Sequence, residues 1–424
     1  MKHKTNYIIA IEYKEYDNDY PNDFVTQLIN REICSVKNNK IKFKVTGFII
    51  YKNTFIIIFP KNYNVPREEK DLLKHAQVLF QVLLKYKQES NLNVEEMELL
   101  GGEDGQYKES YYTSYLIISD FIENGPLKKE IRIESSSYSG RIDWSATINK
   151  KQPIFSEGSV IYNDTVSKKN MIDHHHLLLQ IYRYCVNKSI EKYGWLFDLS
   201  LENVEEFLEL PCDINYGINF LTKELNSTFV DREMKVVKIL RDFLSGIEFD
   251  RFEKIEIMVT PYFHNVWEVI CSFNFKNQYK GLRSLIPKTK WEIESSAKVQ
   301  SQRPDIIFIK EKTIYILDAK YYDIDTNLPG WSDIVKQFFY GFTIFRNINA
   351  KMHQRIKQLE TVENSFLFPS GDLDPIKYVG RVSIEENMDL GYIKAYKINT
   401  FLAMQCYLGK ERFDFINQMI RKIN

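Results

Sequence analysis

Two carboxylates and one amine stand at the ends of two apolar runs in the segment RPDIIFIKEKTIYILDAK, residues 303–320. Both runs are rich in β-branched residues and a short charged turn separates them, so the segment is predicted to form a β-hairpin. A hairpin that is symmetric about this turn places Asp305 directly opposite Asp318. Lys320 follows two residues later and shares the face of Asp318, because side chains in a strand alternate between faces.

The chemistry that this pair suits is the binding of a divalent cation. Two carboxylates that face each other across a sheet repel, and a purely structural sheet avoids that arrangement. Mg²⁺ is a hard cation that prefers oxygen ligands, and Mn²⁺ is a possible substitute. The alternative is a hairpin that ends in exposed acids, since so short a motif also arises by chance. Both strands are apolar on both faces, which indicates buried central strands and favours the functional interpretation.

A third carboxylate lies upstream in the segment TPYFHNVWEVI. Thr260 is expected to cap a helix whose first residue is Pro261, because proline suits the first helical position. The apolar residues of this helix form a buried stripe, and Glu268 falls among them. Glu268 could therefore bring a further carboxylate to the cation. The alternative is an ordinary solvated glutamate on a helix surface.

A second helix is expected to start at Ser332, directly after the second strand of the hairpin. Asp333, Lys336, Gln337 and Tyr340 recur at helical spacing and form one polar stripe. A helix in this place can lay the stripe along the site, where Gln337 could orient a nucleophilic water or a phosphate. A solvated helix face explains the same pattern equally well.

Elsewhere the chain alternates between predicted strands and helices. Strands are expected in residues 42–50 and 54–59 as a hairpin, and alternation also indicates a strand over 141–148. Helices are expected over 67–88, 173–193 and 229–249. The helix over 173–193 carries three successive histidines, which point about 100° apart on a helix and so cannot bind one ion together.

Composition narrows the class of protein. The chain has 424 residues, 27% of them charged, and a formal net charge of zero. A surface that attracts nucleic acid everywhere is therefore excluded, but a local basic groove is not. Such an edge could be formed by lysines and an arginine that could equally be solvated, namely Lys276, Lys280, Arg283, Lys288 and Lys290.

The cysteines and the apolar runs indicate where the protein works. Five cysteines are scattered without a CxxC pair, which argues against zinc and against a disulfide framework. No apolar run reaches the roughly 18 residues that a membrane-spanning helix needs. A cytoplasmic protein without membrane contact is expected.

These motifs together carry a family resemblance. Glu268, Asp305, the triplet Asp318-Ala319-Lys320 and the helix of Gln337 resemble the PD-(D/E)xK nuclease superfamily. More narrowly, the stretches NVWE, RPDIIF, YILDAKYY and DIVKQFFYGF resemble the nuclease subunit of LlaJI-type restriction systems, which is similar to McrC of the McrBC system. The upstream stretch GRIDWSATI resembles a segment that McrC-like chains carry. The resemblance covers about residues 135–400, and the second acid is aspartate rather than glutamate, which the superfamily allows.

The resemblance implies an α+β multidomain protein. Three segments are expected: a β-rich partner-docking domain over 1–110, a helical middle part with some strand over 111–230, and a nuclease domain over 231–424. The last is an α/β PD-(D/E)xK fold with a mixed central sheet flanked by helices.

The resemblance also implies the roles of the site residues. Asp305, Asp318 and Glu268 are expected as ligands of Mg²⁺, with Lys320 beside a metal-bound water. These four residues and Gln337 form the expected catalytic set.

The chain contains no GxxxxGK[ST] nucleotide-binding loop. The resemblance therefore implies that a McrB-like AAA+ GTPase docks through the N-terminal half, recognises DNA and hydrolyses the nucleotide. Two alternatives stay open. One is a nuclease of the same superfamily that acts alone in repair or as an exonuclease. The other is an inactive nuclease fold that serves as a binding module.

Overall fold

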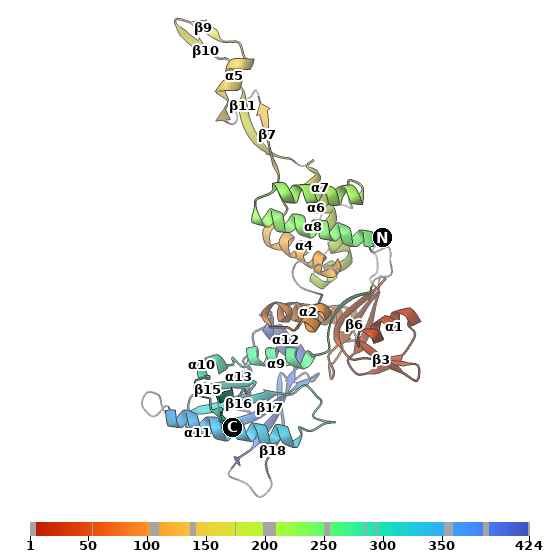
Figure 1. Cartoon of the computed structure of the whole chain (residues 1–424), viewed down its shortest axis with the longest axis vertical. Helices are drawn as coiled ribbons and strands as arrows, with labels where there is room; N and C mark the ends of the chain where they lie inside the picture. The colour runs from red at the N-terminus through yellow and green to blue at the C-terminus, as the bar shows by residue number, and fades with distance from the viewer. Residues whose placement is uncertain are drawn as a thin grey trace. The chain divides into compact units, whose positions relative to one another are not determined.

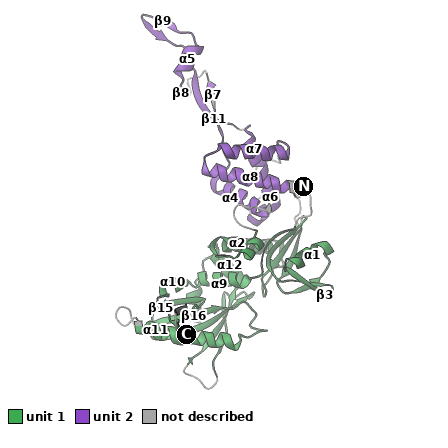
Figure 2. Cartoon of the chain, in the orientation of Figure 1, with its two compact units in different colours: residues 1–103, 254–424 green, residues 104–253 purple. Residues whose placement is uncertain are grey.

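The chain divides into two compact units, and the first is built from two separate stretches of sequence. The computed structural model describes residues 6–52, 54–101, 110–135, 141–173, 175–197, 209–249, 255–284, 286–293, 296–351, 359–384 and 390–422. Unit 1 comprises residues 1–103 and 254–424, and unit 2 comprises residues 104–253 (Figure 2). Unit 2 is therefore an insertion within the sequence of unit 1.

The N-terminal part of unit 1 contains two small sheets. The strands β1 (Asn6–Ile11), β6 (Thr54–Phe59), β5 (Thr46–Tyr51) and β12 (Ile255–Thr260) form one sheet in that order. The strands β2 (Glu15–Asp17), β4 (Lys40–Phe43) and β3 (Cys34–Lys37) form the other, beside helix α1 (Asn22–Asn30). The predicted hairpin is confirmed as β5 and β6, but the expected strand over 42–50 is divided between β4 and β5.

The expected division into consecutive domains differs from these units. Strand β12 pairs in antiparallel fashion with β5, so residues from the two separate stretches of unit 1 share one sheet and one hydrophobic core. The expected boundary at 230 falls inside unit 2, because helix α8 (Asp231–Phe249) packs there against α4 (Ser110–Asn124) and α7 (Ile214–Ser227). The expected nuclease segment over 231–424 therefore combines the last part of unit 2 with the second stretch of unit 1.

The candidate site lies on a five-stranded mixed sheet in unit 1. Its order is β15 (Ile306–Lys310), β16 (Thr313–Ala319), β17 (Thr361–Ser370), β19 (Ile393–Asn399) and β18 (Ile376–Val382). The outer pairs are antiparallel and the central pairs are parallel. In the hairpin of β15 and β16, Ile307 pairs with Ile316 and Ile309 with Ile314, which is the predicted register.

Helices cover this sheet. Helix α11 (Trp331–Lys351) packs Ile344 and Ile348 onto the face that carries Ile307 and Ile316. Helix α9 (Phe263–Asn274) contacts β16, and both α9 and α2 (Glu69–Glu89) contact α12 (Thr400–Tyr407). Figure 1 shows α11 along one side of the strands and α9, α12 and α2 stacked on another. The remaining elements are α3 (Val94–Leu99), α10 (Tyr279–Leu282), β13 (Lys288–Ile293), β14 (Ser296–Ser301) and α13 (Phe415–Arg421).

Unit 2 combines a helical bundle with an arm. The bundle contains α4, α7, α8, α6 (Leu177–Tyr193) and the 3-10 helix η1 (Gly194–Phe197). The arm contains β7 (Glu130–Ser135), β8 (Arg141–Ile142), α5 (Trp144–Lys150), β9 (Ile154–Ser156), β10 (Ser159–Ile161) and β11 (Ser167–Ile172). Within this unit, β7 and β11 lead away from the bundle toward the β9–β10 hairpin (Figure 1).

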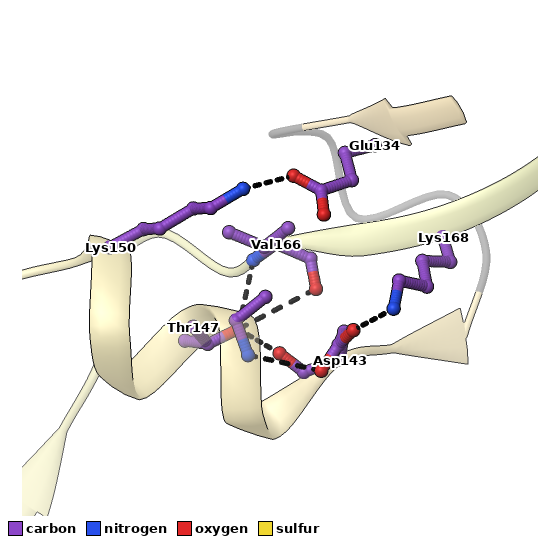
Figure 3. Close-up of polar contacts among 7 residues, drawn as sticks. Glu134, Asp143, Thr147, Lys150, Val166 and Lys168 are labelled. Atoms are coloured by element: carbon purple, nitrogen blue, oxygen red, sulfur yellow. Dashed lines mark hydrogen bonds and ion pairs between the residues drawn. The ribbon is translucent and has the colours of Figure 1, made fainter. Parts of the chain in front are cut away.

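The strand predicted over 141–148 is wrong, because a helix cap interrupts it. Strand β8 ends at Ile142, and the Asp143 side chain accepts a hydrogen bond from the Ala146 backbone N–H at 3.0 Å, which starts α5. Asp143 also pairs with Lys168, and the Thr147 hydroxyl accepts a bond from the Val166 N–H (Figure 3). The local sequence therefore turns into a helix that packs against β11.

The histidine-bearing helix begins later than predicted. Helix α6 starts at Leu177, and the His176 side chain caps it by accepting a bond from the Leu178 N–H at 3.2 Å. His175 lies in the preceding turn, and His174 lies outside the described residues. None of the helices in the described part of the chain is long and apolar enough to span a membrane.

Candidate active site

The two aspartates meet at one end of the β15–β16 hairpin. Asp305 directly precedes β15, and Asp318 is the penultimate residue of β16. The Ala319 backbone N–H donates to Asp305 Oδ2 at 3.1 Å, and the Asp318 carboxyl lies close enough to raise the pKa of Asp305. The structure therefore brings together the two side chains that the hairpin register predicted to face each other.

The pKa of Asp305 shows how strongly this pair resists a second negative charge. Burial, then Asp318 and then Glu268 together raise the pKa of Asp305 to about 8. Asp305 therefore keeps its proton at neutral pH when no cation is bound. A divalent cation would replace that proton, so two adjoining oxygen-donor groups fit the chemistry of Mg²⁺.

Lys320 is held between two carboxylates. Its Nζ lies 2.8 Å from Asp318 Oδ2 and 2.7 Å from Asp333 Oδ1 in the first turn of α11. Burial opposes the charge of this amine, but the charges of Asp318 and Asp333 outweigh burial and raise the pKa of Lys320. Lys320 therefore stays protonated beside the aspartate pair.

Asp333 had been predicted only as part of a polar stripe. The structure makes it the second partner of Lys320, at the point where the chain returns from β16 into α11. The position of Asp333 in the first turn of the helix after Lys320 could have predicted this contact. Acidic residues are common in that turn in any case, because they interact favourably with the helix dipole.

Glu268 lies close enough to the pair for its charge to raise the pKa of Asp305. It is half-buried in α9, and burial raises its pKa, followed by the negative charge of Asp318. Within the described residues, no three acidic, histidine or cysteine side chains converge closely enough to hold one ion. The helix also begins later than predicted, since Thr260 ends β12 and Tyr262 is the N-cap residue.

Gln337 has a different setting from the one expected of a water-orienting residue. Its side chain is 1% exposed, and its Nε2 donates to the Ile316 carbonyl at 2.7 Å. Ile316 lies two residues before Asp318 on β16. The contact joins α11 to the strand that carries Asp318 and Lys320, so the structure gives Gln337 a positioning contact.

Two further residues hold the site and were not singled out from the sequence. Asn277 donates to the Asp305 carbonyl at 2.7 Å and accepts from the Ile307 N–H at 3.1 Å, which fixes the start of β15. No pattern in the sequence distinguishes this asparagine from others in turns.

The second such residue is Tyr321, which follows Lys320. Its hydroxyl donates to the buried carboxylate of Glu12, and it accepts from the Lys61 N–H at 3.1 Å. The Thr46 hydroxyl donates to the same carboxylate at 3.2 Å. Burial raises the pKa of Glu12. This network ties the N-terminal sheet of unit 1 to the residue beside Lys320.

Comparisons with known proteins show which family the chain belongs to. A sequence model of the LlaJI restriction endonuclease family matches residues 45–402. The chain is 27% identical over 412 residues to the type II restriction enzyme BsuMI component YdjA of Bacillus subtilis (strain 168), over 89% of this chain and 84% of that protein. A solved structure of McrC bound to McrB AAA+ hexamers from Thermococcus gammatolerans aligns with 98% of this chain and 100% of that chain, at 15% identity and a TM-score of 0.41. The chain belongs to the LlaJI restriction endonuclease family.

Proposed function

We propose that this protein is the Mg²⁺-dependent DNA endonuclease subunit of a restriction system. The observation that carries the proposal is the joining of Asp305, Asp318 and Lys320 at the end of one hairpin. Membership of a restriction endonuclease family supports the same reaction, which is hydrolysis of a phosphodiester bond.

Asp305 and Asp318 would hold the metal ion, with the Ala319 carbonyl as a further oxygen donor. Mg²⁺ bound there would neutralise phosphate charge and favour ionisation of a water molecule, and Mn²⁺ would serve as a substitute. Glu268 would contribute directly or through a water molecule, since burial and then the nearby negative charge of Asp318 raise its pKa.

Lys320 supplies fixed positive charge at the reacting phosphate. Its ammonium is held in place by Asp318 and Asp333, so it needs no reorientation as negative charge builds up on the phosphate oxygens. Gln337 contributes by fixing β16 through the Ile316 carbonyl. A direct role for Gln337 in orienting water or phosphate stays a prediction.

We infer that an AAA+ GTPase assembles with this chain and recognises the DNA. The sequence contains no nucleotide-binding loop of its own, and the family resemblance carries the rest of this inference. Unit 2 offers a surface for docking, since the β9–β10 hairpin of its arm exposes Phe155, Val160 and Ile161. Exposed apolar side chains in a group are typical of interaction sites.

The test is cleavage of methylated and unmethylated DNA with Mg²⁺, with and without GTP and an AAA+ GTPase, for which the genes that neighbour this one are the place to look. Asp305→Ala and Lys320→Ala are each expected to lower the cleavage rate at least about a hundredfold, because each removes a group that acts on the transition state. The exposed Asp17→Ala serves as the control and should cut normally.

Undiminished cleavage by Asp305→Ala would reject the site. Full cleavage by the wild-type chain without GTP or partner would favour a nuclease that acts alone. Absence of cleavage under every condition would favour an inactive binding module.

A further inference from the structure

One segment of unit 1 is far more basic than the rest of the chain. Residues 276–303, called the basic segment below, contain seven lysines and arginines but only two glutamates, whereas the whole chain has no net charge. Six of the basic side chains are described and all six are exposed, namely Lys276, Lys280, Arg283, Lys288, Lys290 and Arg303. Within the described part of the segment, Lys290 pairs with Glu292, and the segment keeps an excess of positive charge because basic residues outnumber acidic ones.

The first end of the basic segment is fastened to the catalytic hairpin. Asn277 bonds the backbone of Asp305 and Ile307, and the Gln278 N–H donates to the Ile307 carbonyl at 2.8 Å. The Tyr279 hydroxyl then donates to the Gln302 carbonyl at 3.3 Å, which joins the two ends of the segment to each other. The segment is therefore part of the wall of the candidate active site.

The other end of the basic segment brings positive charge to the carboxylates. The Arg303 carbonyl accepts a bond from the Tyr340 hydroxyl on α11 at 3.4 Å. Arg303 lies two residues before Asp305, and Lys336 lies three residues after Asp333, the partner of Lys320 in α11. Both side chains are exposed, so they can contact a ligand that reaches the site from solvent.

Between these ends the segment forms a two-stranded ribbon. Strands β13 and β14 pair in antiparallel register from Lys288 opposite Ser301 to Ile293 opposite Ser296. Trp291 lies in the middle of β13 and is 61% exposed. A two-stranded ribbon has the width that the major groove of B-form DNA admits. The exposed Lys288 and Lys290 of β13 are suited to contact phosphates, and the exposed indole of Trp291 offers a flat apolar surface.

We propose that the basic segment is the surface on which duplex DNA lies, with the β13–β14 ribbon in a groove and Arg303 beside the phosphate that enters the site. This inference rests on the proposed function. It assigns contact with the phosphate backbone of DNA to this chain rather than to a partner protein. A solvated surface accounts for scattered lysines, but it does not account for a ribbon with an exposed tryptophan that is joined at its base to Asp305.

The experiment measures binding of a fluorescently labelled 30-base-pair duplex to the full chain, with Ca²⁺ in place of Mg²⁺ and over a series of salt concentrations. The test variant combines Lys280→Gln, Lys288→Gln and Lys290→Gln, and the control is Lys70→Gln at an exposed position of α2. Each lost phosphate contact makes the negative slope of log K against log salt less steep by about 0.9. The slope of the triple variant should therefore be less steep by about 2 to 3, and its affinity at low salt should be at least about tenfold weaker. Lys70→Gln should match the wild type.

Trp291 supplies an independent arm of the same experiment. Trp291→Ala should weaken duplex binding without changing the salt slope, and Trp291→Phe should retain most of the affinity because a flat ring remains. Circular dichroism and thermal melting of each variant verify that the fold is kept.

Affinity and slope equal to those of Lys70→Gln in the triple variant would overturn the inference, as would absence of duplex binding by the wild-type chain. Failure of the proposed function looks different. In that case the wild type does not cut DNA under any condition, while the triple variant still loses affinity.

Discussion

At the scale of single residues, the site is built around two neighbouring carboxyl groups, one of which keeps its proton at neutral pH. Burial, then Asp318, then Glu268 raise the pKa of Asp305 to about 8, so the metal-free pair keeps one proton at neutral pH. The ammonium of Lys320 pairs with Asp333 as well as with Asp318, so it neutralises only part of the negative charge of the aspartate pair. The two neighbouring carboxyl groups are therefore suited to bind a divalent cation.

The first prediction concerns the stability of the metal-free protein. A carboxyl whose pKa is raised on folding binds its proton more tightly in the folded state. Its contribution is fully present below pH 4 and is lost as pH rises toward about 8. The free energy of unfolding should fall across this range by up to about 1 kcal/mol per pH unit. Denaturant titrations of the wild type and Asp305→Asn measure the difference.

Asp305→Asn should show a flatter pH dependence between pH 5 and 8, because the amide does not titrate. Addition of Mg²⁺ should stabilise the wild type most at the upper end of this range, where no proton competes. Identical pH profiles for the two proteins would contradict the raised pKa of Asp305.

At the scale of elements, the contact between α11 and β16 decides whether the aspartates and Lys320 stay aligned. Gln337 is the polar link, buried at 1% exposure and bonded to the Ile316 carbonyl. Apolar packing of Ile344 and Ile348 against the same face supplies the remaining contact.

The second prediction separates positioning from catalysis at Gln337. Gln337→Leu leaves the buried Ile316 carbonyl without this donor, which should lower the free energy of unfolding by about 1 to 3 kcal/mol. The cleavage rate should fall together with stability. A rate loss with unchanged stability would instead indicate that Gln337 acts on water or phosphate. Val335→Ala, at an exposed position of the same helix, is the control.

The third prediction concerns the link between the N-terminal sheet and the residue after Lys320. Tyr321→Phe removes the donor to the buried Glu12 carboxylate and should lower the cleavage rate while leaving duplex affinity unchanged. Glu12→Gln alone should have a similar effect. In a double-mutant cycle the two changes should be coupled by about 0.5 to 3 kcal/mol in stability, as residues of one hydrogen-bond network are. Additive effects would show that the two side chains do not act together.

At the scale of the whole molecule, one compact unit contains the candidate active site and the other interrupts its sequence. Strand β12 completes its sheet by pairing with β5, which comes from the other side of the insertion. The folding of unit 1 therefore depends on both of its stretches, residues 1–103 and 254–424. Unit 2 carries the exposed apolar hairpin β9–β10, which suits the docking of a partner.

The fourth prediction follows from this layout. A chain in which a short flexible linker replaces residues 104–253 should fold, because unit 1 keeps its sheets and cores. It should bind DNA and Mg²⁺ but no longer bind the AAA+ protein in a pull-down. A fragment of residues 231–424 should fold poorly, since β12 loses β5. Cooperative melting of that fragment, or partner binding by the shortened chain, would contradict these assignments.

The sequence alone determined the β15–β16 hairpin and its register. Alternation of side chains and a short charged turn are local properties, so the spacing predicted that Ile307 pairs with Ile316. The same register placed Asp305 beside Asp318. The burial of the helix that carries Glu268 followed from helical periodicity in the same way. The misplaced start of α6 and the helix at Trp144 show the limit of such patterns, since the capping side chains of His176 and Asp143 override them.

Only the tertiary structure decided which distant residues complete and support the site. The contact of Tyr321 with Glu12 and the pairing of β12 with β5 join residues separated by hundreds of positions. Such contacts depend on how whole elements pack, and no periodicity within a short window encodes them. The same holds for Gln337, whose polar character predicted an exposed role until packing of α11 on β16 buried it.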